Sequence, residues 1–308
     1  MRLLKNKDID RDWWDEIIAS SPLNDPYPYS WYLDIMCPGW QAYYDEEVNA
    51  VMPVPGYRKA LIHYIHTPSF IQRLGIYSPG SDSGDVQARF LARLTYDFPL
   101  VDLCIHGKSG IPEIKYSSRN NYYLDLGKNY KTLYNSFTAA CKRDVKLAKE
   151  ANPDFVPGIP SGDAIDLFIK GPGKLLKGLS RSDYQRLQAL MEYCRSAGLG
   201  EIVGVYKDKS LIYSLFYIKH AGKITALFIS TSMESRIRRS GYFIINHLLE
   251  EFAGSARVYD FAGSELKGVE KFILSFGSAG EEYFSIYSNR LLPPLKQLVE
   301  YRRKRANR

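Results

Sequence analysis

The sequence has few cysteines and no long apolar run. Only four of the 308 residues are cysteines, and no two have the Cys-x-x-Cys spacing of a zinc site or redox pair. Reduced, partly buried thiols are therefore expected, as in a cytoplasmic protein. No stretch approaches the roughly 18 apolar residues of a membrane span, and the first residues lack the apolar centre of a signal peptide. The sequence thus predicts a cytoplasmic protein without stable membrane insertion.

Signatures of covalent, metal-dependent and phosphate-loop chemistry are also absent. No Gly-x-Ser-x-Gly nucleophile elbow occurs. His63 and His66 are three residues apart on a predicted strand, which directs them to opposite faces rather than to one metal ion. The segment 171–174 has glycines and a lysine but lacks the full spacing of a phosphate loop. We therefore expect neither a metal ion nor a tightly bound cofactor.

The net charge of +7 is concentrated near the C-terminal end. Residues 290–308 contain seven basic residues and one acidic residue, so they carry +6 and residues 1–289 carry about +1. A basic tail at 291–308 on a nearly neutral body is more often a solvated end than a binding groove. Contact of this tail with a polyanion, such as RNA or a membrane surface, is the alternative.

Alternating helix and strand patterns predict a mixed α/β fold in two similar halves. Pro153, Pro157 and Pro160 mark the boundary, which gives domains at 1–152 and 153–290. In the first half we expect strands at 41–44, 50–53, 60–66, 74–77, 100–105 and 122–126, a turn at 56–59, and helices at 12–19, 30–36, 85–96 and 130–151. In the second half we expect helices at 162–170, 182–197, 241–252 and 266–275, and strands at 201–206, 211–220, 223–231, 257–261 and 282–287.

The segment from Tyr259 to Tyr283 is the most informative part of the chain. An acid ends a strand, small residues follow that let a ligand approach the backbone, and Lys267 and Lys271 lie four apart on a short helix. Asp260 could take the proton of an attacking amine. Alternatively, its carboxylate stabilises the turn by accepting hydrogen bonds from the next N–H groups, those of Gly263 or Ser264.

A cluster of arginines precedes the helix that begins near Gly241. Cations are disfavoured at a helix N-terminus, so Arg236, Arg238 and Arg239 suggest an anion bound between them and the free N–H groups. The alternative is a solvated loop whose arginines pair with surface acids. The order Arg238-x-x-Gly241-x-Phe243 partly resembles the pyrophosphate loop of acetyl-CoA-dependent N-acetyltransferases. That loop has a small residue where Phe243 stands, which disfavours coenzyme A bound in the usual manner.

Residues 136–150 predict a basic helix. Lys142, Lys146 and Lys149 form one stripe, and Glu150 lies off it. In a groove, this stripe would suit an anionic substrate. On a solvent-facing side it needs no function.

Residues 226–277 resemble the closing pattern of the Fem-type peptidyltransferases and their relatives in the GNAT-like N-acyltransferase superfamily. The shared features are a strand ending in small hydroxyl residues, a long helix, an apolar strand ending in Asp-Phe-x-Gly, and a final Phe-Gly. Residues 136–150 are similar to the basic helix near the end of the first domain of these proteins. The resemblance implies two tandem GNAT-like domains with a substrate groove between them. In Fem-type enzymes the donor is aminoacyl-tRNA and the acceptor a peptidoglycan precursor.

We therefore expect a transferase that moves an acyl or aminoacyl group from aminoacyl-tRNA or acyl-CoA to a small-molecule or peptide amine, which could be a cell-wall precursor. Asp260 would take the proton, and backbone N–H groups at Phe228, Ser230 and Ser232 would polarise the carbonyl. Substrate binding is assigned to Lys142, Arg143, Arg238, Arg239, Gly241, Ser264, Lys267, Lys271 and Phe272. The alternative is an inactive GNAT-fold module that binds a peptide or glycolipid headgroup.

Overall fold

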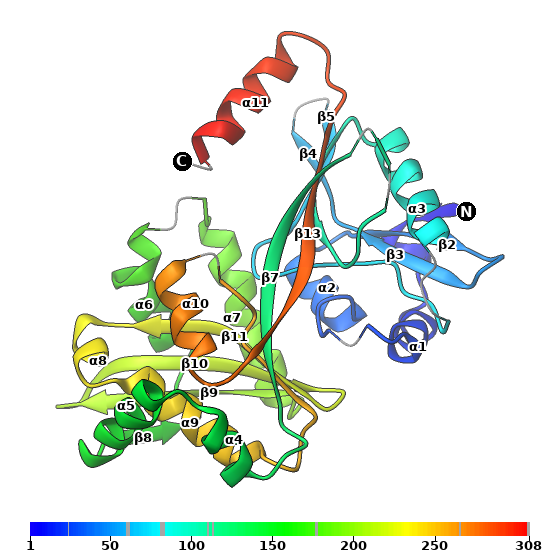
Figure 1. The fold of residues 1–308 in the computed structure, drawn as a ribbon. Helices are drawn as coiled ribbons and strands as arrows, with labels where there is room; N and C mark the ends of the chain where they lie inside the picture. The colour runs from blue at the N-terminus through cyan, green and yellow to red at the C-terminus, as the bar shows by residue number, and fades with distance from the viewer. Residues whose placement is uncertain are drawn as a thin grey trace. The chain divides into compact units, whose positions relative to one another are not determined.

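The structure, a computed structural model, describes residues 1–23, 25–59, 62–80, 84–109, 111–112, 114–175, 178–264 and 266–306. Its sheets contain both parallel and antiparallel strand pairs, and helices alternate with the strands along the chain (Figure 1). The chain divides into two compact units. Unit 1 comprises residues 1–119 and 282–308, and unit 2 comprises residues 120–281.

This division differs from the domains predicted at 1–152 and 153–290. Residues 120–152 belong to unit 2 because the end of strand β7 (Lys115–Asp125) pairs with β12 (Val258–Asp260). Helix α5 (Ala139–Glu150) also packs against α9 (Ser240–Phe252), and the Lys149 ammonium lies 3.1 Å from the Glu250 carboxylate. Pro153 and Pro157 lie inside unit 2, where Pro153 precedes the short strand β8 and Pro157 is its last residue.

Unit 1 contains a three-stranded sheet, β1-β2-β3, and a second set of strands in the order β4-β5-β6-β13. The aromatic rings of Trp14 and Trp40, with centroids 4.7 Å apart, form part of its buried core. The elements are β1 (Arg2–Leu4), α1 (Arg11–Ser20), α2 (Ser30–Met36), β2 (Gln41–Asp45), β3 (Ala50–Val54), β4 (Gly56–Lys59), β5 (Ile62–His66), α3 (Gly84–Asp97), β6 (Leu100–Ile105), β13 (Ala279–Asn289) and α11 (Leu295–Ala306).

Strands β5 and β6 of unit 1 are parallel but pair only briefly, Ile65 with Val101 and His66 with Asp102. Beyond these pairs, the segment that follows β5 lies against β6 in place of a strand. The Leu74 N–H donates to the Cys104 carbonyl at 2.9 Å. The gap beside β6 is therefore filled by the backbone of the chain itself.

A buried ion pair holds this segment of unit 1. The Arg73 guanidinium donates to the Asp25 carboxylate at 2.9 Å, and each residue is only 1% exposed. The same carboxylate oxygen lies 2.7 Å from the His106 ring nitrogen Nε2. The predicted strand at 74–77 is reduced to isolated bridges at Leu74 and Tyr77, because this segment turns around the ion pair instead of extending.

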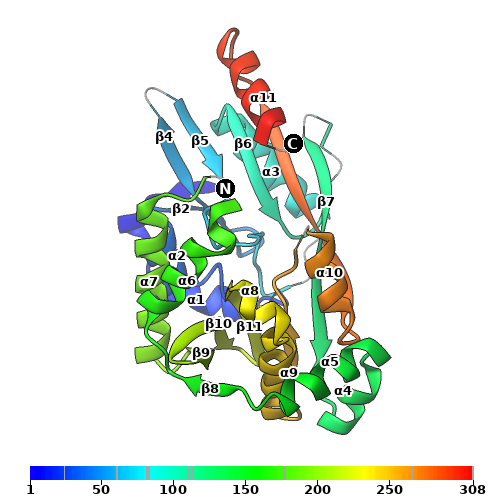
Figure 2. The ribbon, with the colours of Figure 1, turned by 90° about the vertical axis from the view of Figure 1, so that its left-hand side faces the viewer.

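In unit 2 the strands follow the order β7-β12-β11-β10-β9-β8. Helices α6 and α7 cover one face of this sheet, while α9 covers the other, with α4 and α5 packed outside α9 (Figure 2). The further elements are α4 (Tyr130–Ser136), β8 (Asp154–Pro157), α6 (Ser161–Lys170), α7 (Arg181–Ser196), β9 (Gly200–Lys207), β10 (Ser210–His220), β11 (Lys223–Thr231), α8 (Met233–Ile237) and α10 (Lys267–Leu274).

Besides the strand at 74–77, two predicted elements are wrong. The helix expected over 130–151 is two helices, because Thr138 accepts a hydrogen bond from the Cys141 N–H and so caps a new helix, α5. Residues 56–59 form strand β4 rather than a turn, since they pair with β5. Residues 60 and 61 of the predicted strand lie outside the described residues.

Candidate functional site

Strand β11 extends well past its parallel neighbour β12. The two strands pair only over Lys223–Thr225 and Val258–Asp260, whereas β11 continues to Thr231. In this continuing part the register with β10 skips Leu227, which forms a β-bulge. Bulges bend a strand and are frequent beside functional sites. Beyond Thr225, β11 therefore has a backbone edge that β12 does not cover.

The backbone N–H groups expected to polarise a carbonyl point the wrong way. The Ser232 N–H donates to the Ile212 carbonyl of β10 at 3.0 Å. Because the direction of N–H groups alternates along a strand, those of Ser230 and Phe228 also point to β10. The Ser230 side chain is buried and donates to the Ala164 carbonyl at 2.6 Å. These three residues therefore support the strand instead of facing a substrate.

The same alternation directs the N–H groups of Ile229 and Thr231 to the uncovered edge. The Gly171 backbone approaches the end of this edge so closely that a Cβ there would lie 2.6 Å from the Thr231 carbonyl. The Ile229 N–H lies two residues earlier on the strand, and the Ile229 side chain is half-buried. It is the best-placed donor for a developing negative charge.

Asp260 is completely buried where β12 ends. Its oxygen Oδ1 accepts hydrogen bonds from the Ala262 N–H at 2.8 Å and from the Asn121 amide at 3.0 Å. The Lys223 ammonium lies 3.6 Å from Oδ2. Ala262 has a φ of +56°, a conformation that is costly for a residue with a Cβ. This geometry favours the turn-stabilising alternative, with Ala262 as the donor in place of Gly263 or Ser264.

The arginines before α9 are paired with carboxylates. Arg239 donates to Asp144 at 2.8 Å, and Arg238 donates to Glu234 at 2.5 Å. The hydrogen bond from Arg238, assisted by one from Lys207, lowers the pKa of the Glu234 carboxyl. An anion at this helix terminus would therefore compete with carboxylates that are already in place.

Gly241 is closely packed rather than open to a ligand. A Cβ at this position would lie 3.4 Å from the rings of both Phe272 and Tyr213. The ring of Phe243 turns to β8, where its centroid lies 6.0 Å from that of Phe155. The rings of Phe272 and Tyr213 thus lie at van der Waals distance from this position of α9.

A pocket of about 200 Å³ does reach the first turn of α9. Its lining includes Arg238, Lys207 and Ser240, with Asp154 as the acidic member. Ser240 is 2% exposed, and within the described part of the chain its hydroxyl has no hydrogen-bond partner. Buried hydroxyl groups are usually bonded, so this one marks a place for a polar ligand or water.

Comparison with known proteins was made at the level of sequence and of structure. No family model and no curated protein matches the sequence. Solved structures do match. FemX has a TM-score of 0.66 and 14% identity over 97% of this chain and 100% of its own. The L-PGS of Bacillus licheniformis has a TM-score of 0.55 and 11% identity over 95% and 96% of the two chains.

A tandem GNAT protein from the clavulanic acid biosynthesis pathway also matches, with a TM-score of 0.52 and 13% identity over 93% of this chain and 97% of its own. The chain has a Fem-type, GNAT-like fold. The expected mixed α/β fold class is therefore confirmed. At these identities the likeness concerns the fold alone.

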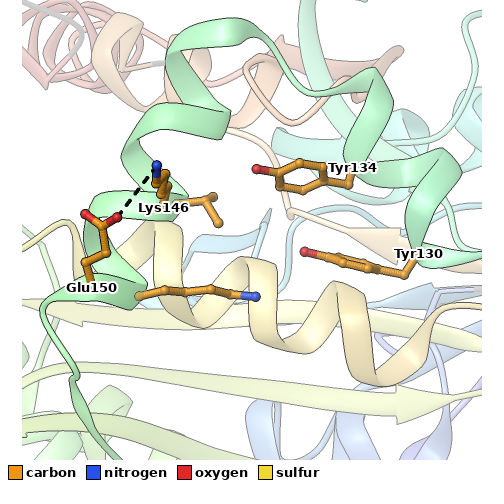
Figure 3. Close-up of a pocket in the computed structure, with 6 residues that line it drawn as sticks. Tyr130, Tyr134, Lys146 and Glu150 are labelled. Atoms are coloured by element: carbon orange, nitrogen blue, oxygen red, sulfur yellow. Dashed lines mark ion pairs between the residues drawn. The ribbon is translucent and has the colours of Figure 1, made fainter.

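The basic helix expected in such a fold is α5, and its lysines border a second pocket. This pocket of about 270 Å³ lies between α4 and α5, with the rings of Tyr130 and Tyr134 facing Lys146 and Glu150 (Figure 3). The Lys146 ammonium lies 3.8 Å from the Glu150 carboxylate. The prediction that Glu150 lies off the lysine stripe is therefore wrong, because one helical turn separates the two residues.

The other members of the lysine stripe contact the same tyrosines. The Lys142 ammonium lies 5.7 Å from the centroid of the Tyr134 ring, and that of Lys149 lies 6.0 Å from the Tyr130 ring. Burial raises the pKa of Tyr130 to about 12, and its hydroxyl donates to Asn246 at 2.7 Å. Near neutral pH the Tyr130 phenol therefore stays uncharged.

The remaining predicted residues surround α10 or lie on α5. Lys267 and Lys271 are exposed on α10, and Phe272 packs against Tyr242, with ring centroids 4.8 Å apart. The Ser264 hydroxyl accepts a hydrogen bond from the Leu266 N–H at 3.2 Å. Exposed Arg143 lies 3.7 Å from Asp144. The two lysines of α10 remain accessible to a ligand in the way expected.

Within the described ranges, no group of three or more His, Cys, Asp and Glu side chains is arranged to hold a metal ion. In the same ranges no helix has the length and apolar character needed to cross a bilayer. All four cysteines are free thiols.

Proposed function

We propose that unit 2 transfers an acyl or aminoacyl group from an activated donor to an amine. The observation that carries the proposal is the edge of β11 beyond Thr225, which does not pair with β12. The Ile229 N–H points to this edge, and the strand that follows the Leu227 bulge fixes its direction. A preorganised N–H group stabilises the negative charge that develops on a carbonyl oxygen under attack. The likeness of the fold to FemX and to a tandem GNAT protein supports the same class of reaction.

The chemistry requires only two bound substrates. The neutral amine attacks the carbonyl carbon, and a carbon–nitrogen bond forms. The bond from that carbon to the oxygen or sulfur of the donor then breaks, and the amine proton passes to the leaving group or to water. Binding the two substrates together supplies much of the acceleration. Asp260 acts as a positioning residue in this scheme, because its buried carboxylate holds the turn after β12.

Of the two donors, we favour aminoacyl-tRNA over acyl-CoA, because of the residues around the first turn of α9 and the lysines of α5. The rings of Phe272 and Tyr213 crowd Gly241, and Arg238 and Arg239 are paired with carboxylates, so a pyrophosphate at α9 is disfavoured. The lysine stripe of α5 is a second basic surface that a phosphodiester backbone could contact. Lys146 and Lys149 pair there with Glu150 and Glu250, and among the described residues only Lys142 of the stripe has no carboxylate partner. Binding of tRNA should then weaken steeply with salt, whereas tight binding of free coenzyme A would establish the other donor.

Ile229→Pro tests the proposed donor of the hydrogen bond. Proline removes this N–H, and because that N–H points away from β10 no ladder hydrogen bond is lost. We expect turnover with a labelled acyl donor to fall by about 100-fold. The matched control is Phe228→Pro, which does remove a ladder bond and should lower the melting temperature more. Ile229→Val, which keeps the N–H, should retain turnover.

Unchanged turnover in correctly folded Ile229→Pro protein would refute the assignment of this N–H. The wider proposal is tested by incubating the wild-type chain with aminoacyl-tRNA or acyl-CoA and a panel of amines, among them a peptide and a cell-wall precursor. Transfer of label to any amine supports an enzyme. Stabilisation by one ligand, with no transfer from either donor, would establish the alternative of a peptide-binding or headgroup-binding module.

A further inference from the structure

Helix α11 of unit 1 has an apolar stripe that faces solvent. Leu295, Leu298 and Tyr301 follow one another at intervals of three residues, which places them along one side of a helix. Their exposed fractions are 44%, 45% and 59%. Leu292, just before the helix, is 79% exposed. Four large apolar side chains in a short basic segment are too many to be accounted for as isolated surface residues.

The opposite side of α11 attaches the helix to unit 1. Arg303 donates to Asp102 of β6 at 3.0 Å, and its guanidinium lies 4.1 Å from the centroid of the Tyr287 ring of β13. Val299 precedes Arg303 by one turn and is half-buried. These contacts fix which side of α11 faces inward, so the stripe of Leu295, Leu298 and Tyr301 is held outward.

Basic residues surround the exposed stripe. Arg302, Lys304 and Arg305 are exposed, and none of them forms an ion pair with a residue that the structure describes. Arg302 follows Leu295 by two turns, and Arg305 follows Leu298 by two turns, so both arginines lie on the outward side. Apolar side chains and uncompensated positive charge are thus presented on one surface.

We infer that α11 binds the surface of an anionic lipid bilayer. In this arrangement the apolar side chains of α11 enter the acyl boundary and the arginines contact the anionic lipid headgroups. RNA would satisfy the arginines but would leave Leu295 and Leu298 in water. The membrane therefore accounts for both parts of the surface. This inference does not depend on the reaction proposed for unit 2.

Vesicle co-sedimentation tests the inference with the full chain. We expect binding to phosphatidylcholine vesicles that contain phosphatidylglycerol, and weaker binding as salt rises. Arg302→Gln/Arg305→Gln should weaken binding by about 25-fold, since each basic residue near an anionic surface contributes roughly five-fold. Leu295→Gln/Leu298→Gln should weaken it by at least about ten-fold through lost apolar burial.

A matched control separates α11 from apolar exposure in general. Leu147 and Ile169 are exposed to 39% and 43% and lie on α5 and α6, so Leu147→Gln/Ile169→Gln should bind vesicles like the wild type. Equal binding to vesicles of pure phosphatidylcholine would overturn the inference. So would binding of bulk tRNA that is lost in the arginine variant and kept in the leucine variant, without any binding to vesicles. Because no acyl donor is present, failure here leaves the transferase proposal unaffected.

Discussion

The two units share a local strand–helix–strand topology, but the strand edge beyond the parallel pair differs between them. In each unit an antiparallel hairpin is followed by a helix and then by a strand parallel to the end of the hairpin, β5 with β6 and β11 with β12. In unit 1 the space beyond the short pairing is filled, because Leu74 is hydrogen-bonded to Cys104. In unit 2 the strand with Ile229 continues past its partner with its edge uncovered.

The difference is the reason that the proposed site lies in unit 2 and not in unit 1. A strand edge whose hydrogen bonds are made by the chain itself has nothing to offer a substrate. The buried pair of Arg73 and Asp25 stabilises this closed arrangement in unit 1. In unit 2 the buried carboxylate of Asp260 instead ends the shorter strand and leaves the longer one uncovered. Similar topology therefore closes the strand edge in unit 1 and leaves the proposed site beside β11 in unit 2.

The largest expected effect is on the free energy of unfolding, at the Arg73–Asp25 ion pair of unit 1. Arg73→Ala leaves the Asp25 carboxylate buried without its main cation, and we expect the free energy of unfolding to fall by about 3–5 kcal/mol. Urea denaturation measures this loss. Hydrogen exchange at the Leu74 N–H should accelerate more than at the Ser232 N–H of unit 2.

Arg93→Ala provides the control for the Arg73 variant. It breaks the pair with Asp97, in which Arg93 is 48% exposed, and should cost no more than about 1 kcal/mol. Equal losses in the two variants would show that the Arg73 pair does not specifically lock the segment beside β6.

A smaller effect is expected at Asp260 of unit 2. Asp260→Asn keeps an oxygen that can accept from Ala262, so stability should fall by about 1 kcal/mol and turnover should stay within roughly ten-fold. Asp260→Ala removes the acceptor and should cost about 1.5–3 kcal/mol. A loss of turnover of about 100-fold or more in folded Asp260→Asn would show instead that this carboxylate is the general base.

The smallest effect concerns the thiols of the two units. Burial raises the pKa of Cys141 to about 11 and that of Cys194 to about 12, both in unit 2. The thiolate is the reactive form, so raising the pKa lowers the reactive fraction at any pH below it. We expect iodoacetamide to label these two cysteines near pH 8 only after unfolding. Mass spectrometry of the native protein should find Cys104, which is partly exposed, labelled before them.

The sequence predicted the elements of unit 2 best where periodicity was long. Strands β9, β10 and β11 and helix α9 begin and end within a residue or two of their predicted bounds. Short elements were missed: β8 is four residues long and α8 five, too short for periodicity to show. The basic tail was expected to be a solvated end, whereas residues 295–306 form α11. Arg308 lies outside the described residues.

The residue roles were harder to predict than the elements. The sequence assigned the backbone N–H groups of Phe228, Ser230 and Ser232, which point to β10, whereas the proposal above assigns that of Ile229. The direction of an N–H depends on register with β10, and the bulge at Leu227 shifts that register. The partners of Arg239 and Asp260, which are Asp144 and Asn121, lie 95 and 139 residues away in sequence. No local pattern could have identified such long-range pairs.

Strand β8 is the last strand of the order in unit 2. It spans only Asp154–Pro157, and Pro153 comes directly before it. Proline has no N–H, so a further strand added alongside would find neither the length nor the donors that a stable ladder needs. Growth of the sheet at β8 by recruitment of another chain is thereby discouraged.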